Sequence, residues 1–302
     1  MKIQCKGIAN KSAKGEILDV YFPCIEYGEN RISSELQISN NLNQELIEIN
    51  WNEEDLGKPI ENVEGAYLKL QLLSNKFVLP NSINIDGLFS NIPNVVWTNQ
   101  GPISIEEIDK KLHESKLNNN DLHIKSVDKF PCLTDYIVPR KVRIADTSRV
   151  RLGAYLSEGT TIMHEGFVNF NAGTLGSAMI EGRISAGVVV GNNSDIGGGA
   201  STMGTLSGGN ETKIFIGENC LLGANSGIGI SLGDNCTVEA GLYLTSGTKV
   251  TIFDNDVSKI IKAVELSGKP NILYYRDSTN GKVIAAENNK ISDLNKELHS
   301  ND

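Results

Sequence analysis

The chain has 302 residues, with 28 Lys and Arg against 37 Asp and Glu, which gives a formal net charge of −9. A general nucleic-acid-binding protein needs a basic stripe, so this balance argues against that class. No uninterrupted apolar run approaches the roughly 18 residues of a membrane span, and residues 1–6 lack the apolar segment of a secretory signal. The five cysteines are widely separated and form no CxxC motif, which predicts free thiols in a reducing cytoplasm.

The first part of the chain, residues 1–137, is typical of a mixed α/β domain. Apolar residues predict strands at 16–22 and 66–73. Ser104 and Glu107 form a capping pattern, which predicts a helix that begins there and ends near 118–120. The apolar face of that helix consists of Ile105, Ile108 and Leu112. No motif in this part of the chain indicates chemistry.

A different pattern occupies residues 138–253, where aliphatic side chains recur every six positions. A six-residue unit is a short strand plus a turn, and three units close one triangular coil with an aliphatic residue pointing inward on each face. Small residues two positions earlier also point inward, which places Cys220 and Cys236 in the core rather than among the nucleophiles. The sequence therefore predicts a parallel β-helix. Its aliphatic series is Ile144, Val150, Leu156, Ile162, Val168, Ile184, Val190, Ile196, Ile216, Leu222, Ile228, Leu232, Val238, Leu244 and Val250.

The period is interrupted between Val168 and Ile184, and again at residues 203–213. The second interruption predicts an excursion, a segment that leaves the regular coil. Irregular backbone within a regular repeat is where a functional site is expected. The last segment, residues 254–302, is predicted to cap the final coil with a strand at 273–275. A short terminal helix is indicated by Ile291, Leu294 and Leu298.

Two strings in the repeat region carry a family resemblance: His-Glu-Gly-Phe-Val-Asn-Phe-Asn-Ala-Gly at 164–173 and Glu-Gly-Arg-Ile-Ser-Ala-Gly at 181–187. They resemble the tetrahydrodipicolinate N-succinyltransferases, in particular the actinobacterial-type branch. These hexapeptide-repeat acyltransferases move the succinyl group of succinyl-CoA to the nitrogen of (S)-2,3,4,5-tetrahydrodipicolinate in lysine and diaminopimelate biosynthesis. The resemblance implies left-handed coils, a cytoplasmic homotrimer and active sites between neighbouring prisms.

The resemblance makes Glu181 the candidate catalytic carboxylate. It matches a glutamate to which the family assigns attack on the succinyl group through an acyl-anhydride, while a general-base role is the rival mechanism. Arg183 lies two residues further on, so in a strand both side chains would share a face and the guanidinium would keep the carboxylate ionised. We interpret His164 as a positioning residue rather than as the general base.

The family pattern also assigns the coenzyme A contacts. Bare backbone at the glycines and alanines would let the pantetheine lie close, and the cationic side chains would meet its phosphates. The matching positions are Arg183, Gly198, Ser201, Ala224, Glu239, Ala240, Gly247, Lys262, Tyr275, Arg276, Asp277 and Ser278.

A magnesium ion on the trimer axis is implied at Glu165, because three symmetry-related carboxylates repel unless a cation neutralises them. The family's second acidic metal position corresponds to Ser148 here. The anionic acceptor would take hydrogen bonds from Arg183, Ser185, Asn169 and Asn171.

Two other functions stay open at this point. One is an acetyl-CoA-dependent acyltransferase acting on the same acceptor, and the other is a non-catalytic hexapeptide scaffold. A hexapeptide carbonic anhydrase needs several histidines on neighbouring coils, and His164 is the only histidine in the repeat region.

Overall fold

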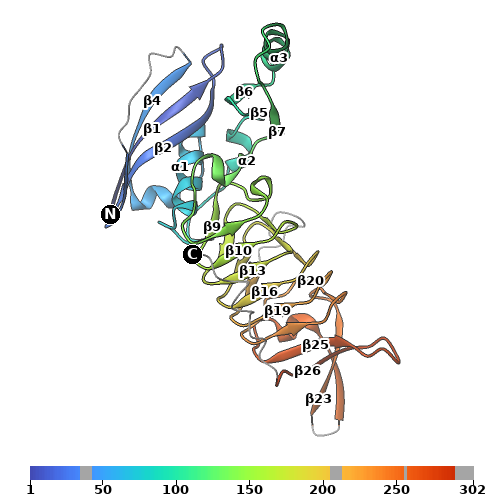
Figure 1. The fold of residues 1–302 in the computed structure, drawn as a ribbon. Helices are drawn as coiled ribbons and strands as arrows, with labels where there is room; N and C mark the ends of the chain where they lie inside the picture. The colour runs from blue at the N-terminus through green and yellow to red at the C-terminus, as the bar shows by residue number, and fades with distance from the viewer. Residues whose placement is uncertain (35–42, 205–212, 255–256, 290–302) are drawn as a thin grey trace. The chain divides into compact units, whose positions relative to one another are not determined.

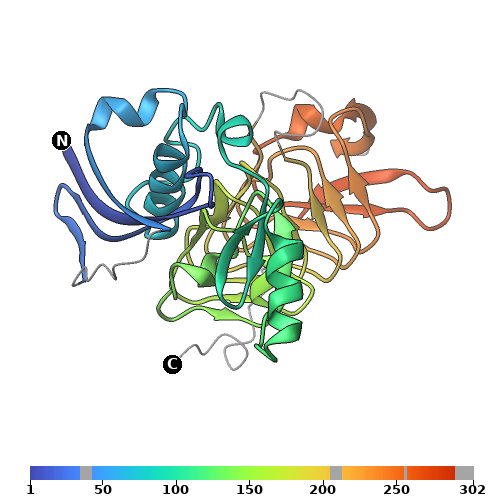
Figure 2. The same ribbon diagram turned by 90° about the horizontal axis from the view of Figure 1, so that it is seen from above.

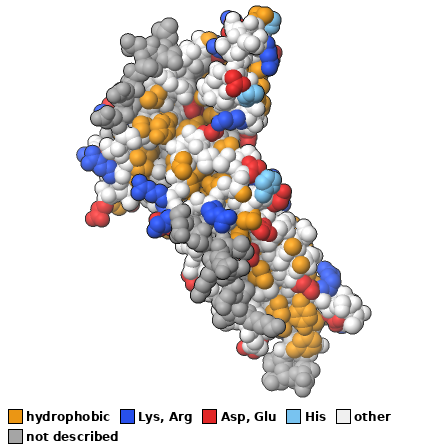
Figure 3. All heavy atoms as spheres, in the orientation of Figure 1, with side chains coloured by type: hydrophobic (Ala, Val, Ile, Leu, Met, Phe, Trp, Pro, Cys, Tyr) orange, Lys and Arg blue, Asp and Glu red, His pale blue; other side chains and the backbone are white. Residues whose placement is uncertain are grey.

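The structure is a computed structural model that describes residues 1–34, 43–204, 213–254 and 257–289. The chain divides into two compact units, Met1–Pro131 and Cys132–Asp302. No helix among the described residues is long and apolar enough to cross a membrane. On the surface drawn in Figure 3, acidic and basic side chains are interspersed rather than gathered in a basic stripe.

The N-terminal unit contains a four-stranded antiparallel sheet in the order β3-β2-β1-β4. Helix α1 packs against this sheet (Figure 2). Along β1 the side chains alternate between solvent and the buried side, with Ile3 and Cys5 inside. The strands are β1 (Lys2–Lys11), β2 (Ile17–Tyr27), β3 (Asn30–Ser33) and β4 (Gln44–Asn52), and α1 is Val63–Ser74.

The strand predicted at 66–73 is wrong, because this segment forms the middle of α1. The alternation of Lys69 and Gln71 with leucines suggested an exposed polar face, but both side chains are 1% exposed. The Lys69 ammonium donates hydrogen bonds to the carbonyls of Leu56, Lys58 and Asn84, at 3.2, 2.6 and 2.7 Å. The Gln71 amide bonds to the backbone of β2 at Val20 and Phe22. A helix buried on nearly all sides has no polar face from which its period could be read.

A three-stranded sheet and two further helices complete this unit. Helix α3 ends at Leu117 as predicted but begins at Ile108, three residues after the predicted start. The Ser104 hydroxyl donates to the Glu107 carboxylate at 2.7 Å, so this pair stabilises the turn before the helix rather than capping its first residue. The elements are α2 (Leu88–Asn91), β5 (Val95–Thr98), β6 (Gly101–Ser104), α3 (Ile108–Leu117) and β7 (Ile124–Asp128).

The second unit is a parallel β-helix whose coils stack along its axis (Figure 1). The coils contribute short parallel strands to three faces. The first face consists of β8 (Arg143–Ile144), β10 (Thr160–Ile162), β13 (Ala178–Ile180), β16 (Ser194–Ile196), β19 (Leu221–Leu222) and β21 (Thr237–Val238). The second consists of β11 (Phe167–Val168), β14 (Arg183–Ile184), β17 (Ser201–Thr202), β20 (Gly227–Ile228) and β22 (Tyr243–Leu244). The third consists of β9 (Ala154–Leu156), β12 (Ala172–Thr174), β15 (Val189–Val190) and β18 (Phe215–Ile216).

The predicted inward series forms the core of this helix. On the first face Ile162, Ile180 and Ile196 are at most 1% exposed and lie level with one another in the parallel register. Cys220 and Cys236 are fully buried among them, as the small-residue positions predicted. Each coil thus stacks its apolar residues on those of its neighbours, which a single coil could not bury alone.

The C-terminal segment extends the first face. Strand β25 (Ile272–Arg276) adds to β21 in parallel, with Tyr274 continuing the inward column level with Val238. Strand β26 (Val283–Glu287) then pairs antiparallel with β25, and β23 (Lys249–Asp254) and β24 (Val257–Lys262) complete the sheet. The strand predicted at 273–275 is present. The excursion at 203–213 and the terminal helix fall almost wholly outside the described residues.

Candidate active site

The site lies at the first corner of the β-helix, where the chain passes from the first face to the second. Most coils take six residues from the inward residue of the first face to that of the second, for example from Ile162 to Val168 and from Ile196 to Thr202. The coil between them takes four, from Ile180 to Ile184. The first register break is therefore a corner that is two residues shorter than the corners on either side.

Two hydrogen bonds to one carbonyl oxygen, together with a glycine, hold the short corner in place. The carbonyl oxygen of Ile196 accepts hydrogen bonds from the backbone N–H groups of both Glu181 and Gly182, at 2.8 and 3.0 Å. A Cβ at Gly182 would lie 2.5 Å from the carbonyl oxygen of Ala200, so only glycine fits there. This turn fixes the point at which Glu181 leaves the coil.

The Glu181 side chain is half-buried and lies over the next coil. Its Oε2 is 3.4 Å from the position that a Cβ at Gly198 would occupy. Within the described part of the chain, its carboxylate has no hydrogen-bond or ion-pair partner. Burial, together with the Glu181 charge, raises the pKa of the neighbouring Asp195 carboxyl to about 6.

Arg183 does not pair with Glu181 in the way that a shared strand face would allow. Glu181 lies in the corner, whereas Arg183 begins β14 on the second face and donates from Nη2 to the Ser201 hydroxyl at 2.5 Å. Arg183 and Ser201, both assigned to coenzyme A by resemblance, are thus brought together on adjacent rungs.

A recess opens beside the short corner, with a volume of about 500 Å³. The corners before and after the corner of the Glu181 coil are each two residues longer. Both of these corners contribute to the lining, which consists of Arg149, Glu165, Phe167, Gly182, Arg183, Gly199, Ala200 and Ser201.

Three of the predicted coenzyme A residues form a column along the same corner. Gly198, Ala224 and Ala240 occupy successive coils, joined by hydrogen bonds from Asn225 N to Gly198 O and from Gly241 N to Ala224 O, both 2.9 Å. Ala224 and Ala240 are exposed, so the column presents backbone to solvent. An extended chain could lie along it without meeting large side chains at these positions.

The column continues into β25. The Glu239 carboxylate accepts from the backbone N–H of Arg276 at 2.8 Å, which brings these two predicted residues together. Tyr275, Asp277 and Ser278 flank Arg276 at the end of this strand. The Asp277 carboxylate accepts from the N–H and hydroxyl of Thr279, and these bonds hold its pKa below the usual value.

Gly247 and Lys262 lie at a different corner. Gly247 follows the second face in the last coil, and Lys262 ends β24 beside it, where Ala263 N bonds to Thr248 O at 2.8 Å. Both are exposed. The structure therefore divides the predicted coenzyme A residues between two corners, with the second face between them.

Glu165, the predicted magnesium ligand, is exposed beside two basic side chains. Its carboxylate lies 3.8 Å from the Arg149 guanidinium and 3.3 Å from Nδ1 of His164. The described residues of one chain contain no group of three His, Cys, Asp or Glu side chains that could hold a metal. A magnesium ion at Glu165 therefore stays a prediction, in which further carboxylates would come from other copies of the chain.

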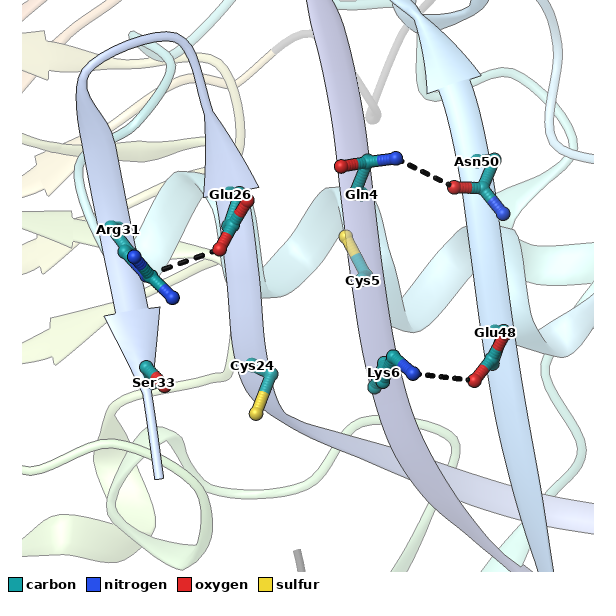
Figure 4. A pocket seen from close by; sticks show the side chains of 9 residues that line it. All are labelled: Gln4, Cys5, Lys6, Cys24, Glu26, Arg31, Ser33, Glu48 and Asn50. Atoms are coloured by element: carbon teal, nitrogen blue, oxygen red, sulfur yellow. Dashed lines mark hydrogen bonds and ion pairs between the residues drawn. The ribbon is translucent and has the colours of Figure 1, made fainter. Parts of the chain in front are cut away.

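A second hollow, of about 470 Å³, lies on the outer face of the N-terminal sheet (Figure 4). Its charged side chains are paired across neighbouring strands, Lys6 with Glu48 at 2.8 Å and Arg31 with Glu26 at 3.1 Å. These pairs neutralise each other, so this hollow concentrates no charge of one sign.

Sequence reasoning did not single out Arg149, Phe167 or Asp195 as site residues. The four-residue step from Ile180 to Ile184 was a usable signal, because a shortened corner exposes the rungs on both sides of it. Arg149 lies level with Phe167 in the adjacent coil because Val150 pairs with Val168. The sequence alone does not give this register between coils.

The comparisons with known proteins agree with this geometry. Residues 213–246 match the family model described as the hexapeptide repeat of succinyl-transferase, and residues 92–131 match the middle region of tetrahydrodipicolinate N-succinyltransferase. The second match falls in the part of the chain where the sequence showed no chemical motif.

Curated relatives share most of the chain. The 2,3,4,5-tetrahydropyridine-2,6-dicarboxylate N-succinyltransferase of Pseudomonas aeruginosa is 57% identical over 237 residues, which cover 78% of this chain and 69% of the relative. That of Vibrio cholerae is 55% identical over 246 residues, covering 81% and 71%. A solved structure from Campylobacter jejuni, described as a candidate 2,3,4,5-tetrahydropyridine-2-carboxylate N-succinyltransferase, superposes with a TM-score of 0.83 at 32% identity over 96% of this chain and 93% of that one.

A hexapeptide β-helix with a carboxylate at a shortened corner thus defines this chain as an enzyme of the hexapeptide-repeat acyltransferase class. More particularly, it belongs to the 2,3,4,5-tetrahydropyridine-2,6-dicarboxylate N-succinyltransferase family. The actinobacterial-type branch stays a prediction.

Proposed function

We propose that this enzyme transfers the succinyl group of succinyl-CoA to the nitrogen derived from 2,3,4,5-tetrahydrodipicolinate, with Glu181 as the catalytic carboxylate. Water adds to the ring C=N bond and opens the ring to an amino ketone, whose nitrogen takes the succinyl group. The products are N-succinyl-2-amino-6-oxopimelate and CoA. The names of the relatives support the substrates, and the reaction belongs to lysine and diaminopimelate biosynthesis.

The observation that carries the proposal is the short corner. It places the Glu181 carboxylate, which has no partner among the described residues, over Gly198 of the bare-backbone column. The next residue, Gly182, lines the recess that contains two arginines. The column suits the extended pantetheine of a thioester donor, and the recess suits an anionic acceptor. A reacting carbonyl at the junction of the two would lie beside Glu181.

Glu181 can act by either of two balanced routes. As a nucleophile, its carboxylate attacks the thioester carbonyl, the C–S bond breaks and CoA leaves as the thiolate. The amine then attacks the mixed anhydride, which restores the carboxylate, and the proton that the nitrogen loses goes to the CoA thiolate. As a general base, the carboxylate takes the amine proton while the nitrogen attacks the thioester directly, and that proton goes to the departing thiolate.

Donor binding is assigned to the corner column and to β25. Gly198, Ala224 and Ala240 would lie along the pantetheine, and Arg276 would meet phosphate at the end of the column. Glu239 orders this end by accepting from Arg276 N. Gly247 and Lys262, at the other corner, would reach the same donor only from across the second face or from another copy.

A homotrimer is part of the proposal. The outer faces of the β-helix carry exposed apolar side chains, with Leu175 and Phe215 at 42% and Tyr243 at 45% exposed, which flat prism packing would cover. Light scattering should give three times the 32.8 kDa chain mass. A monomeric mass would contradict the trimer and, with it, magnesium held by three copies of Glu165. No step of the transfer uses the metal.

The decisive experiment measures succinyl-CoA consumption with the cyclic imine for the wild type, Glu181→Gln and the matched control Glu218→Gln. Glu218 is an exposed carboxylate at another corner of the same β-helix. We expect Glu181→Gln to lower kcat by at least about 10²–10⁴-fold, the range attributed to a positioned acid or base, and Glu218→Gln to leave it unchanged. Near-normal turnover in Glu181→Gln would contradict the assigned role.

Two further readouts separate the alternatives. Stoichiometric release of CoA thiol from succinyl-CoA without acceptor indicates the anhydride route, and its absence indicates the general base. A preference for acetyl-CoA over succinyl-CoA in competition would replace the donor with the acetyl alternative. A wild type with no turnover of either thioester would favour the scaffold.

A further inference from the structure

The outward side chains of the first face include one carboxyl group between apolar neighbours. Asp195 lies level with Met179 on the preceding coil and with Leu221 on the following coil. Met179 is buried, and both Asp195 and Leu221 are half-buried. Within the described part of the chain, the Asp195 carboxylate has no hydrogen-bond or ion-pair partner. A carboxylate in this position lacks the donors that usually stabilise its charge.

Glu181 lies on the same outer side of the β-helix, on the coil directly before Asp195. Glu181 follows the inward residue Ile180, and Asp195 precedes Ile196, which lies level with Ile180 in the next coil. Neighbours of an inward residue point outward, so both carboxylates leave on the outer side. The Glu181 Oε2 is 3.4 Å from the position that a Cβ at Gly198 would occupy, so this carboxylate lies over the coil that carries Asp195.

The charge of Glu181 acts on the Asp195 carboxyl. Together with burial, it raises the pKa of Asp195 to about 6. Between β8 and β21, the other charged residue of the outward column is Arg143, three rungs away and therefore roughly 14 Å distant. Arg183 is on the second face and donates to Ser201. The described residues thus place no cation at the pair, and the repulsion between its carboxylates is not neutralised.

We infer that Asp195 is a positioning residue that acts through Glu181: its negative charge repels the Glu181 carboxylate and favours the steps that neutralise this carboxylate. The inference rests on the proposed function. Both routes neutralise Glu181, by acylation in the anhydride route and by a proton in the general-base route. The repulsion is relieved at that point. The coupling is reciprocal, since Glu181 favours the neutral form of Asp195 to the same extent.

The inference makes turnover depend on the protonation of Asp195. When Asp195 binds a proton, its charge disappears and Glu181 is no longer repelled. The pKa of about 6 therefore predicts that kcat rises as the pH increases through this value. Asp195→Asn imitates the protonated side chain at every pH, so this variant should lack the part of the rise that Asp195 causes.

The test uses the full chain and measures kcat and KM for succinyl transfer between pH 5 and pH 8. We expect Asp195→Asn to lower kcat about three- to tenfold at pH 8, because an interaction of one pKa unit corresponds to a factor of ten. At pH 5 its kcat should be within twofold of the wild type. The KM for each substrate should change less than twofold, since Asp195 acts through Glu181 rather than on a substrate.

Matched variants separate the charge of Asp195 from its packing. Asp195→Glu keeps the charge and should keep the rise of kcat with pH. Glu218→Gln removes an exposed carboxylate from another corner of the same β-helix and should leave the pH profile unchanged.

A second readout does not depend on activity. Carboxyl carbon NMR follows the titration of Asp195 directly, with a midpoint of about 6 expected in the wild type. Glu181→Gln removes the neighbouring charge and should lower this midpoint, whereas Glu218→Gln should not move it.

Each outcome decides the inference. If the wild type transfers succinyl groups and Asp195→Asn keeps the same pH dependence, the inference fails while the proposed function stands. A kcat lowered by the same factor at every pH would also overturn it, because that result indicates packing alone. A midpoint of Asp195 that Glu181→Gln does not move would contradict the coupling. A wild type that transfers no succinyl group would refute the proposed function and the inference together.

Discussion

The N-terminal unit and the β-helix place their polar side chains in opposite ways. In α1, Lys69 and Gln71 are buried and serve the backbone of distant segments, 11 to 51 residues away in sequence. In the β-helix, Glu181 and the recess arginines point away from an apolar core whose backbone bonds are already made between coils. In the repeat, the backbone groups form their hydrogen bonds with neighbouring coils. Side chains at a break in the period are therefore not needed for these bonds and can take part in the reaction.

The largest effect should come from restoring the period at the short corner. Inserting Gly-Asn between Gly182 and Arg183 would give this coil the six-residue step of its neighbours, which the fold accommodates elsewhere. We expect the thermal midpoint to stay near that of the wild type and kcat/KM to fall at least about 10²-fold, because misplacement of a catalytic group by about 1 Å already costs that much. Steady-state kinetics and thermal unfolding measure the two effects.

The same Gly-Asn inserted after Gly15, in the exposed turn between β1 and β2, is the control and should leave kcat/KM unchanged. Full activity in the corner insertion would mean that the shortened coil has no catalytic purpose.

Replacing Lys69 tests the buried polar arrangement of the N-terminal unit. Lys69→Met leaves three carbonyls without their donor, so we expect the free energy of unfolding to fall by about 1–3 kcal/mol. Chemical denaturation measures this change, with Lys110→Met at an exposed position of α3 expected to stay within about 0.5 kcal/mol of the wild type. An equal effect of the two variants would contradict a structural role for the Lys69 hydrogen bonds.

The same lysine should make stability depend on pH. Burial lowers the pKa of Lys69 to about 8, below its usual value of 10.5. Between these values the unfolded chain holds a proton that the folded chain has released, so the contribution of Lys69 to stability rises with pH across this window. Denaturation at pH 8 and pH 10.5 should show a rise in the wild type that Lys69→Met lacks; identical slopes would refute the assignment.

The smallest effect is expected at Asp195, the carboxyl next to Glu181. Its pKa of about 6 lies above the usual 3.8, so the folded chain holds the extra proton between these values and stability falls as pH rises from 4 to 6. Asp195→Asn should flatten this part of the stability profile while the fold is retained. A profile with the same slope in both proteins would show that Asp195 does not titrate there.

The repeat was predictable because its information is local. Six-residue spacing alone identifies the inward residues, the coil and the buried cysteines, and it marks the first break as a place to look. The details of the site depend on register between coils, which brings Arg149 level with Phe167 and separates Arg183 from Glu181. In the N-terminal unit the mistaken strand at 66–73 has the same cause, since the partners of Lys69 and Gln71 lie in other segments.

The antiparallel strand β26 has a consequence for how copies of the chain can associate. A stack of parallel rungs with an open last rung would be a template for end-to-end polymerisation into fibres, as any unpaired strand edge is. Here β25 adds the last parallel rung to the first face, and β26 runs against it. The parallel rungs of this face therefore end at β25, and the sheet continues through β26 and β23 to β24, so its outer edge is a hairpin strand rather than a rung of the coil on which another copy could stack.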